Sequence, residues 1–170
     1  MMEIGIYDDF FSEEIHKEIY NMLIHSNQWS FAGGEFPNRF WHIDGLEQNQ
    51  FFRSYLFKII CDKLDKSFDV KRIYCNGQTA CQSGAPHTDD GDITFLYYPN
   101  LEWEVGFGGE LFFIEDDEII KTVSYKPNRA VIFPAKIIHY AGAPHRFVPD
   151  LRISLAYKFL YNEALTVETI

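Results

Sequence analysis

The sequence predicts an α+β fold in which a helical front packs against an antiparallel β body. The segments before residue 67 carry apolar residues at helical spacing, whereas six or more short β-rich runs follow residue 68. Short strands that follow one another without intervening helices are typical of antiparallel sandwiches and barrels. We therefore expect one domain over 1–170, with a helical front and loop over 1–67 and the β core over 68–160.

The first expected helix begins after Ser12. The hydroxyl of this residue can cap the helix, and Glu13 and Glu14 place negative charge where the helix dipole favours it. An apolar stripe then continues at helical spacing as far as about His25, formed by Ile15, Ile19, Met22 and Leu23. This pattern predicts an amphipathic helix that buries one face.

The segment 29–45 has a different composition. It is rich in Gly, Pro, Asn and aromatic residues, which favours an irregular loop. A second helix is expected over 47–65, where a broad apolar face is formed by Phe52, Tyr55, Leu56, Ile59, Ile60 and Leu64. Both helices should therefore pack with their apolar faces on one sheet of the β body.

The β body is expected from a series of short runs separated by Gly, Pro, Asn and Asp. These runs are KRIYC, DITFLYY, GELFFIE, KTVSY, RAVIFP and RISLAYKF. Each is rich in β-branched or aromatic residues, which are enriched in strands. With 16 Phe, 10 Tyr and 3 Trp, the chain also has enough large side chains to fill a compact core.

Charge and cysteine content limit the expected partners and compartment. The net charge of −10 repels phosphate backbones and anionic lipids, so we expect no nucleic-acid and no membrane partner. The acidic start MMEIGIYDDF is not typical of a signal peptide or an anchor, and no apolar run is long enough to span a membrane. The 3 cysteines form no C-x-x-C pair, which fits reduced thiols in the cytoplasm.

A histidine followed two residues later by a carboxylate can supply two ligands of a metal site. On a strand these two side chains point the same way, and a non-haem iron site uses two histidines and one carboxylate. The spacing occurs at His87–Asp89, His42–Asp44 and His16–Glu18. His16 falls on an expected helix, where residues two apart do not share a face, and His42 precedes the β core. We therefore favour His87–Asp89, which stands just before the run DITFLYY.

The third ligand has to come from a distant strand. One candidate is His139, which follows an apolar strand in IFPAKIIHYAG, and the other is His145 in APHRF. A single histidine is more often an ordinary surface or core residue than a ligand. The residue pattern alone therefore leaves both candidates open.

Arg152 is a candidate for binding a carboxylate. Alternation along RISLAYKF puts Arg152 and Ser154 on the same face of an otherwise apolar strand. A planar guanidinium can hold a carboxylate through two charge-assisted hydrogen bonds. Taken alone, however, this position is better explained as an edge-strand charge that reaches solvent.

Four elements in a fixed order resemble the prolyl 4-hydroxylase branch of the Fe(II)- and 2-oxoglutarate-dependent dioxygenases. They are His87–Asp89, the GGEL of Gly108–Leu111, the FPAKIIH of Phe133–His139, and the strand that starts at Arg152. Together they lie within Ile73–Phe159, about half of the chain. The resemblance implies a double-stranded β-helix, a jelly-roll and cupin-like architecture, with a metal site at one mouth.

The same resemblance implies roles for individual residues. His87, Asp89 and His139 would be the iron ligands. Arg152 would bind the remote carboxylate of 2-oxoglutarate, and Ser154 lies beside it on the same strand face. We count all of these as expected site residues.

Two tyrosines and one interval match the family less closely. Tyr98 resembles a tyrosine that hydrogen-bonds the same remote carboxylate, and Tyr74 resembles one that lines the co-substrate pocket. Both are equally explained as aromatic core residues. The 13 residues from His139 to Arg152 are a few more than the commonest family interval, which makes Arg146 the alternative to Arg152.

The resemblance implies a cytoplasmic dioxygenase that uses Fe(II), 2-oxoglutarate and dioxygen, with ascorbate as an optional further cofactor. Its expected substrate is a prolyl residue in a peptide or protein. The alternatives are a hydroxylase of free proline or another small molecule, and a non-catalytic cupin-like metal-binding module. A nucleic-acid demethylase is disfavoured because basic clusters are lacking. A purely structural β-sandwich would bind no metal.

Overall fold

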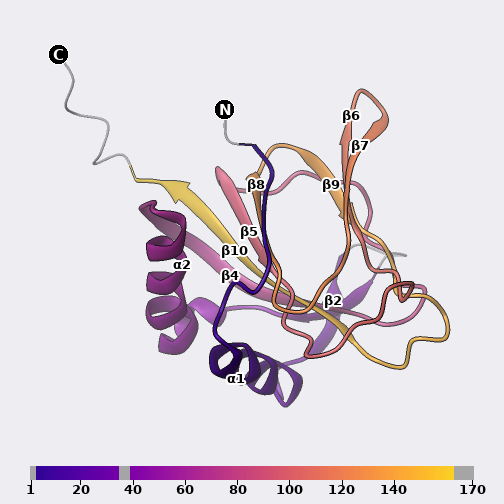
Figure 1. Cartoon of the computed structure of the whole chain (residues 1–170), viewed down its shortest axis with the longest axis horizontal. Coiled ribbons are helices and arrows are strands. Elements are labelled where there is room, and N and C mark those ends of the chain that lie inside the picture. Colours follow the sequence, from indigo (N-terminus) through magenta and orange to yellow (C-terminus); the bar gives the residue numbers. More distant parts are fainter. Residues whose placement is uncertain (1–2, 35–38, 163–170) are drawn as a thin grey trace.

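The computed structural model describes residues 3–34 and 39–162, which form two antiparallel sheets that face each other (Figure 1). The large sheet contains, in spatial order, β1 (Gly5–Tyr7), β8 (Ala130–Pro134), β5 (Ile93–Tyr97), β10 (Arg152–Tyr161), β4 (Phe68–Gln78), β3 (Phe40–Ile43) and β2 (Ser30–Gly33). The small sheet contains β7 (Glu118–Val123), β6 (Leu111–Glu115) and β9 (Ile138–Ala141). All strand pairs are antiparallel, as the sequence predicts.

The helices cover the side of the large sheet that faces away from the small sheet (Figure 1). Helix α1 (Glu13–Ile24) begins where expected, and the Ser12 hydroxyl accepts a hydrogen bond from the backbone N–H of Ile15. The second helical segment is less regular than expected. It consists of a 3-10 turn (Leu46–Gln48), a π-helical stretch (Phe51–Leu56) and helix α2 (Phe57–Leu64). Within the described residues, no helix has the length and apolar character needed to cross a membrane.

Four strands, namely β1, β2, β3 and β9, are not expected from the sequence. The interpretation of 29–45 as an irregular loop is wrong, because β2 and β3 form a hairpin at the edge of the large sheet, and β1 lies at the opposite edge. The first 67 residues are therefore not only helix and loop. These strands have 3 or 4 residues each, as does β9, which gives them too little sequence for a strand pattern. They are stabilised by pairing with neighbours distant in sequence, which local composition does not encode.

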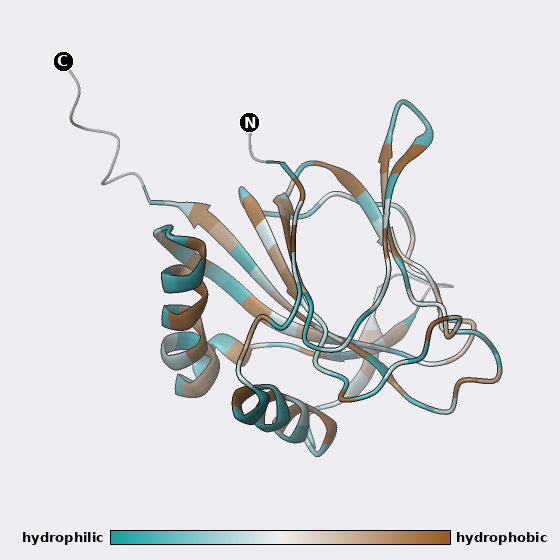
Figure 2. Cartoon of the chain, in the orientation of Figure 1, coloured by the Kyte–Doolittle hydropathy of each residue, from teal (hydrophilic) through white to brown (hydrophobic). Residues whose placement is uncertain are grey.

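Strand β10 separates two buried regions, because its side chains alternate between the two faces of the large sheet. One set packs under the helices and comprises Ile153, Leu155, Tyr157 and Phe159. The other set faces the small sheet and comprises Arg152, Ser154, Ala156 and Lys158. Hydrophobic and hydrophilic bands accordingly alternate along β10 (Figure 2). All residues from 152 to 159 are buried, so the inner face holds two buried cations.

The loop between β4 and β5 is attached to both sheets. The backbones of His87 and His139 exchange two hydrogen bonds of 3.0 and 2.9 Å, which join the loop to β9. The N–H of Asp89 donates to the carbonyl of Ala135 at 2.7 Å. Gly91 then turns the chain at a φ of +94°, where an added Cβ would lie 2.9 Å from the carbonyl oxygen of Phe159. These contacts fix the positions of residues 87 and 89 relative to β9.

Candidate metal centre and co-substrate cleft

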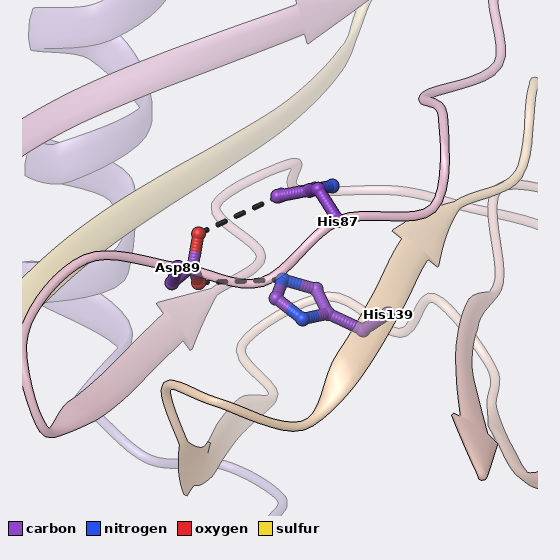
Figure 3. A group of neighbouring side chains, drawn as sticks. All are labelled: His87, Asp89 and His139. Carbon is purple, nitrogen blue, oxygen red and sulfur yellow. Dashed lines mark ion pairs between the residues drawn. The ribbon is translucent and has the colours of Figure 1, made fainter.

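His87, Asp89 and His139 come together at one end of the space between the sheets (Figure 3). Their candidate ligand atoms all lie within 4.8 Å of one another. The Nε2 atom of His87 is 3.5 Å from Asp89 Oδ1, and the Nε2 atom of His139 is 3.3 Å from Asp89 Oδ2. His139 projects from β9, and the other two side chains come from the loop that precedes β5. Two distant segments thus supply the three groups that the sequence singles out.

Hydrogen bonds orient both imidazole rings for metal binding. The Nδ1 of His87 donates to the carbonyl of Ala85 at 2.8 Å, and the Nδ1 of His139 donates to that of Ile137 at 2.9 Å. Because a carbonyl can only accept, each Nδ1 carries the proton and each Nε2 can offer a lone pair. Two lone pairs directed at a carboxylate are favourable when a cation lies between them. The donor set therefore fits a divalent metal ion bound by two histidines and one carboxylate.

Asp89 is the most enclosed member of the trio. Its side chain is 5% exposed and that of His139 is 6% exposed, whereas that of His87 is 52% exposed. Burial alone would raise the pKa of Asp89. The neighbouring His139 and His87 side chains and the charge of Lys158 outweigh this effect and hold the pKa of Asp89 well below its usual range. Asp89 is therefore a carboxylate at any physiological pH.

Two members of the trio, His87 and Asp89, line a cleft of about 780 Å³. Its walls include the β2–β3 hairpin, the inner face of β4 and the loop around residues 84–90. Tyr74, Asn76 and Gln78 lie along β4 in this wall, and Ser154 contributes from β10. A volume of this size falls within the range of small-molecule binding sites.

Arg152 is buried near the end of this cleft. It is 1% exposed, its Nε donates to the carbonyl of Gly109 at 2.8 Å, and its Nη1 donates to Gln78 Oε1 at 2.9 Å. The guanidinium carbon lies 5.4 Å from the ring centroid of Tyr98 and 4.9 Å from that of Tyr125. The explanation of Arg152 as a solvent-reaching charge on an edge strand is wrong, because β10 is central in the sheet.

Two buried polar atoms, on the neighbouring side chains of Arg152 and Tyr98, have no hydrogen-bond partner. Among the described residues, three buried side-chain atoms lack a partner, and two of them are Arg152 Nη2 and Tyr98 Oη. An unpaired buried donor costs about 1–3 kcal/mol, so such groups need an explanation. Both atoms can donate to one carboxylate. This end of the cleft therefore fits an acid group bound by Arg152 and Tyr98.

The remaining expected pocket residues also lie in this region. Tyr74 is 7% exposed and lines the cleft, with the Arg72 guanidinium 4.5 Å from its ring centroid. Burial, and then the charge of Asp89, raise the pKa of the Tyr74 phenol, which keeps it protonated. Ser154, which follows Arg152 by two residues and lies on the same face of β10, is buried and lines the cleft. Both positions are compatible with contact to a bound co-substrate.

The alternative residues lie elsewhere or are engaged differently. His16 is buried on α1, where its Nε2 is 2.9 Å from the carbonyl of Pro99, and therefore links the helix to the loop after β5. His42 lines the cleft, but its Nδ1 pairs with Asn76 Oδ1 at 2.7 Å. His145 and Arg146 are both exposed on the loop before β10. None of these four residues joins the trio in the described part of the chain.

Three residues that contact the site are not expected from the sequence. Lys158 and Thr94 both hydrogen-bond Asp89 Oδ2, and Gln78 binds the Arg152 guanidinium. The alternation of RISLAYKF places Lys158 on the same strand face as Arg152, which is a signal that could have identified it. Gln78 and Thr94 depend on strand register, which only the assembled sheet defines.

The structure is similar to those of several oxygenases, although the sequence is not. No protein-family model matches the chain, and no curated protein sequence matches it either. A prolyl-4-hydroxylase from Pseudomonas putida superposes with a TM-score of 0.70 at 15% identity over 94% of this chain and 92% of that one. A prolyl hydroxylase from Trichoplax adhaerens was solved with a peptide fragment of the hypoxia inducible factor oxygen degradation domain. It superposes with a TM-score of 0.73 at 14% identity, over 97% of this chain and 87% of that one.

A third similar structure is an oxidoreductase of the 2OG-Fe(II) oxygenase family from Burkholderia pseudomallei. It gives a TM-score of 0.69 at 11% identity, covering 92% of this chain and 84% of that one. At such low identities the similarity establishes the fold. The predicted α+β double-stranded β-helix, with helices packed on one sheet, is therefore confirmed.

Proposed function

We propose that this protein, which has the fold of the 2-oxoglutarate- and Fe(II)-dependent oxygenases, is itself such a dioxygenase and hydroxylates its substrate. The observation that carries the proposal is the presence of two candidate sites beside one cleft, which is lined by His87 and Asp89 of one site and by Gln78, the hydrogen-bond partner of Arg152, at the other. His87, Asp89 and His139 can hold a metal, and Arg152 with Tyr98 can hold a carboxylate. A non-catalytic cupin-like module needs the metal site but not a buried, unsatisfied arginine next to it.

Each residue of the cleft has a distinct task in this proposal. The trio binds Fe(II), since two histidines and a carboxylate with open positions are typical of non-haem iron oxygenases. Bound iron supplies the activation of dioxygen, coupled to conversion of 2-oxoglutarate into succinate and carbon dioxide. Arg152 and Tyr98 donate hydrogen bonds to the remote carboxylate of 2-oxoglutarate. Ser154 and Tyr74 form the walls between these two ends of the cleft.

Within this proposal the substrate is a prolyl residue in a peptide or protein. Two prolyl hydroxylases share the fold over nearly the whole chain, and the one from Trichoplax adhaerens was solved with a peptide fragment. The net charge of −10 makes nucleic acid an unfavourable substrate. The cleft of about 780 Å³ supports a second candidate, a small molecule such as free proline. We place the protein in the cytoplasm, and a requirement for ascorbate stays a prediction.

The test is turnover of 2-oxoglutarate by protein reconstituted with Fe(II) under anaerobic conditions. We expect succinate on admission of oxygen, and a mass gain of one oxygen atom on a proline-containing peptide or on free proline. Asp89→Ala should abolish iron binding and turnover, because the carboxylate provides the only negative charge among the three ligands. His42→Ala is the matched control, since His42 lines the same cleft without joining the trio, and it should retain iron.

Loss of iron binding in His42→Ala, or its retention in Asp89→Ala, would mean that the metal site is misassigned. A wild-type protein that binds iron but neither binds nor converts 2-oxoglutarate would support the metal-binding module instead.

A further inference from the structure

Lys158 is a buried cation in direct contact with the carboxylate of the trio. It is 1% exposed and projects from the inner face of β10, six residues after Arg152 on the same strand. Its ammonium group forms an ion pair with Asp89 Oδ2 and donates to Thr94 Oγ1 at 3.1 Å. A lysine is almost never fully buried without a partner, so this contact accounts for its location. It does not explain why the partner is a candidate metal ligand.

The two oxygens of Asp89 have different surroundings. Oδ2 accepts hydrogen bonds from Lys158 and from the Thr94 hydroxyl, the latter at 2.6 Å. These two donors use both lone pairs of that oxygen, although His139 Nε2 also lies 3.3 Å from it. Oδ1 has one neighbour among the polar groups of the described residues, the His87 Nε2 at 3.5 Å. Oδ1 is therefore the oxygen with lone pairs left for a metal.

We infer that Lys158 is a positioning residue that reserves Asp89 Oδ2 and so restricts the carboxylate to coordination of the metal through Oδ1 alone. The inference rests on the proposed metal site and deepens it. A carboxylate that binds through one oxygen occupies one coordination position, whereas binding through both oxygens would occupy two. Lys158 thereby keeps a position open for 2-oxoglutarate or dioxygen.

The charge of Lys158 has a second effect on the same site. An ammonium group next to the ligand repels a divalent cation and lowers its affinity. The same charge attracts the dianion 2-oxoglutarate. Lys158 should therefore weaken metal binding and strengthen co-substrate binding.

The experiment measures Co(II) binding and the Co(II) absorption spectrum of the full chain, because the intensity of the ligand-field bands depends on coordination number. Lys158→Met keeps the aliphatic stem and removes both the donor and the charge. We expect Co(II) to bind about tenfold more tightly with a changed spectrum, since Oδ2 becomes free to coordinate. 2-Oxoglutarate should bind the Co(II)-loaded variant about tenfold more weakly.

Two further variants separate the hydrogen bond from the charge. Lys158→Gln retains a donor for Oδ2 without the charge, so it should bind Co(II) more tightly but keep the wild-type spectrum. Lys136→Met is the matched control, because the Lys136 ammonium donates to the main-chain carbonyl of Asp89 at 3.1 Å and not to its carboxylate. It should leave the spectrum unchanged.

An unchanged spectrum in Lys158→Met, or weaker Co(II) binding, overturns the inference. If that variant does not fold, Lys158→Gln decides, and Co(II) binding that is unchanged or weaker overturns the inference. A wild-type protein that binds Co(II) with the expected responses but does not bind 2-oxoglutarate overturns the proposed function and leaves the role of Lys158 intact. Absence of Co(II) binding in the wild type overturns both.

Discussion

At the scale of single residues, the site is built from groups that are costly to bury without partners. Arg152, Asp89 and Lys158 are each at least nine-tenths buried by exposed area. Asp89 and Lys158 neutralise each other, whereas Arg152 has no carboxylate partner among the described residues. An unneutralised buried guanidinium next to a cleft is the strongest local indication of an acidic ligand.

Arg152→Met should weaken 2-oxoglutarate binding by about 100-fold, because two hydrogen bonds to a charged group contribute about 3 kcal/mol in total. Iron affinity should stay close to that of the wild type, since Arg152 does not contact the trio. Titration of the metal-loaded protein with 2-oxoglutarate measures the effect. The control is Arg146→Met, on the exposed part of the loop before β10, and it should have no effect. The reverse pattern would transfer the role to Arg146.

The candidate metal-binding trio could be predicted from the sequence more fully than the groups that surround it could. The strand that follows His87–Asp89 distinguishes it from two equivalent spacings, and the structure places it beside His139. The tautomers of both rings, however, depend on carbonyls of Ala85 and Ile137, whose positions are set by backbone geometry. The contact between Lys158 and Asp89 joins residues 69 positions apart, which no local pattern encodes.

At the scale of elements, the turn before β6 determines where Arg152 lies. Gly109 has a φ of +82°, and an added Cβ would lie 2.8 Å from both Cδ and Nε of Arg152. This closeness is a physical reason for the second glycine of the GGEL motif. The strand β10 and this turn therefore fix the guanidinium from two sides.

Gly109→Ala should displace Arg152 and weaken 2-oxoglutarate binding by about tenfold or more, a loss of at least one ordinary hydrogen bond. It should also lower stability by about 1 kcal/mol or more, because alanine disfavours positive φ. Gly106→Ala is a useful control, since it has a φ of +98° but nothing within 4 Å of the added Cβ. It should lower stability without affecting 2-oxoglutarate. An equal loss of binding in both variants would show that backbone strain, and not contact with Arg152, is responsible.

Helix α1 and the longer strands could be predicted because their patterns are local. Ser12 and the apolar spacing after it define α1, and alternation defines both faces of β10. The β2–β3 hairpin could not be predicted, because its place in the sheet depends on pairs such as Trp41 with Gly77, which lie far apart in sequence. The β9 strand was missed for the same reason, although it carries His139.

At the scale of the whole molecule, ion pairs join the N-terminal segment to the β body. Asp8, just after β1, accepts hydrogen bonds from Arg129 Nε at 2.6 Å and from Lys126 at 2.8 Å. The hydrogen bonds from Arg129 and then Lys126 lower the pKa of Asp8 to about 2. Because the pKa of Asp8 is lower in the folded than in the unfolded chain, its ion pairs stabilise the fold at pH values at which the carboxyl of the unfolded chain is ionised.

The contribution of Asp8 should be fully present above about pH 4 and should disappear as the pH falls towards 2. Asp8→Asn should therefore lower the free energy of unfolding near neutral pH, by no more than about 1 kcal/mol because solvent screens this partly exposed group. The difference from the wild type should vanish near pH 2. Denaturant unfolding at a series of pH values measures it, with Glu18→Gln on the exposed face of α1 as control. A difference that does not change with pH would exclude the ion pair as its cause.

The central position of β10 links the chemistry of the cleft to the slowest motion of the protein. Its backbone is paired with β4 over 152–161 and with β5 over 155–159, and residues 152–159 are all buried. Amide protons in such a strand exchange with deuterium only when the whole domain opens. Lys158, which lies in the part of β10 paired on both sides, therefore cannot be released by local fraying, and loss of its contact with Asp89 on heating should coincide with global unfolding.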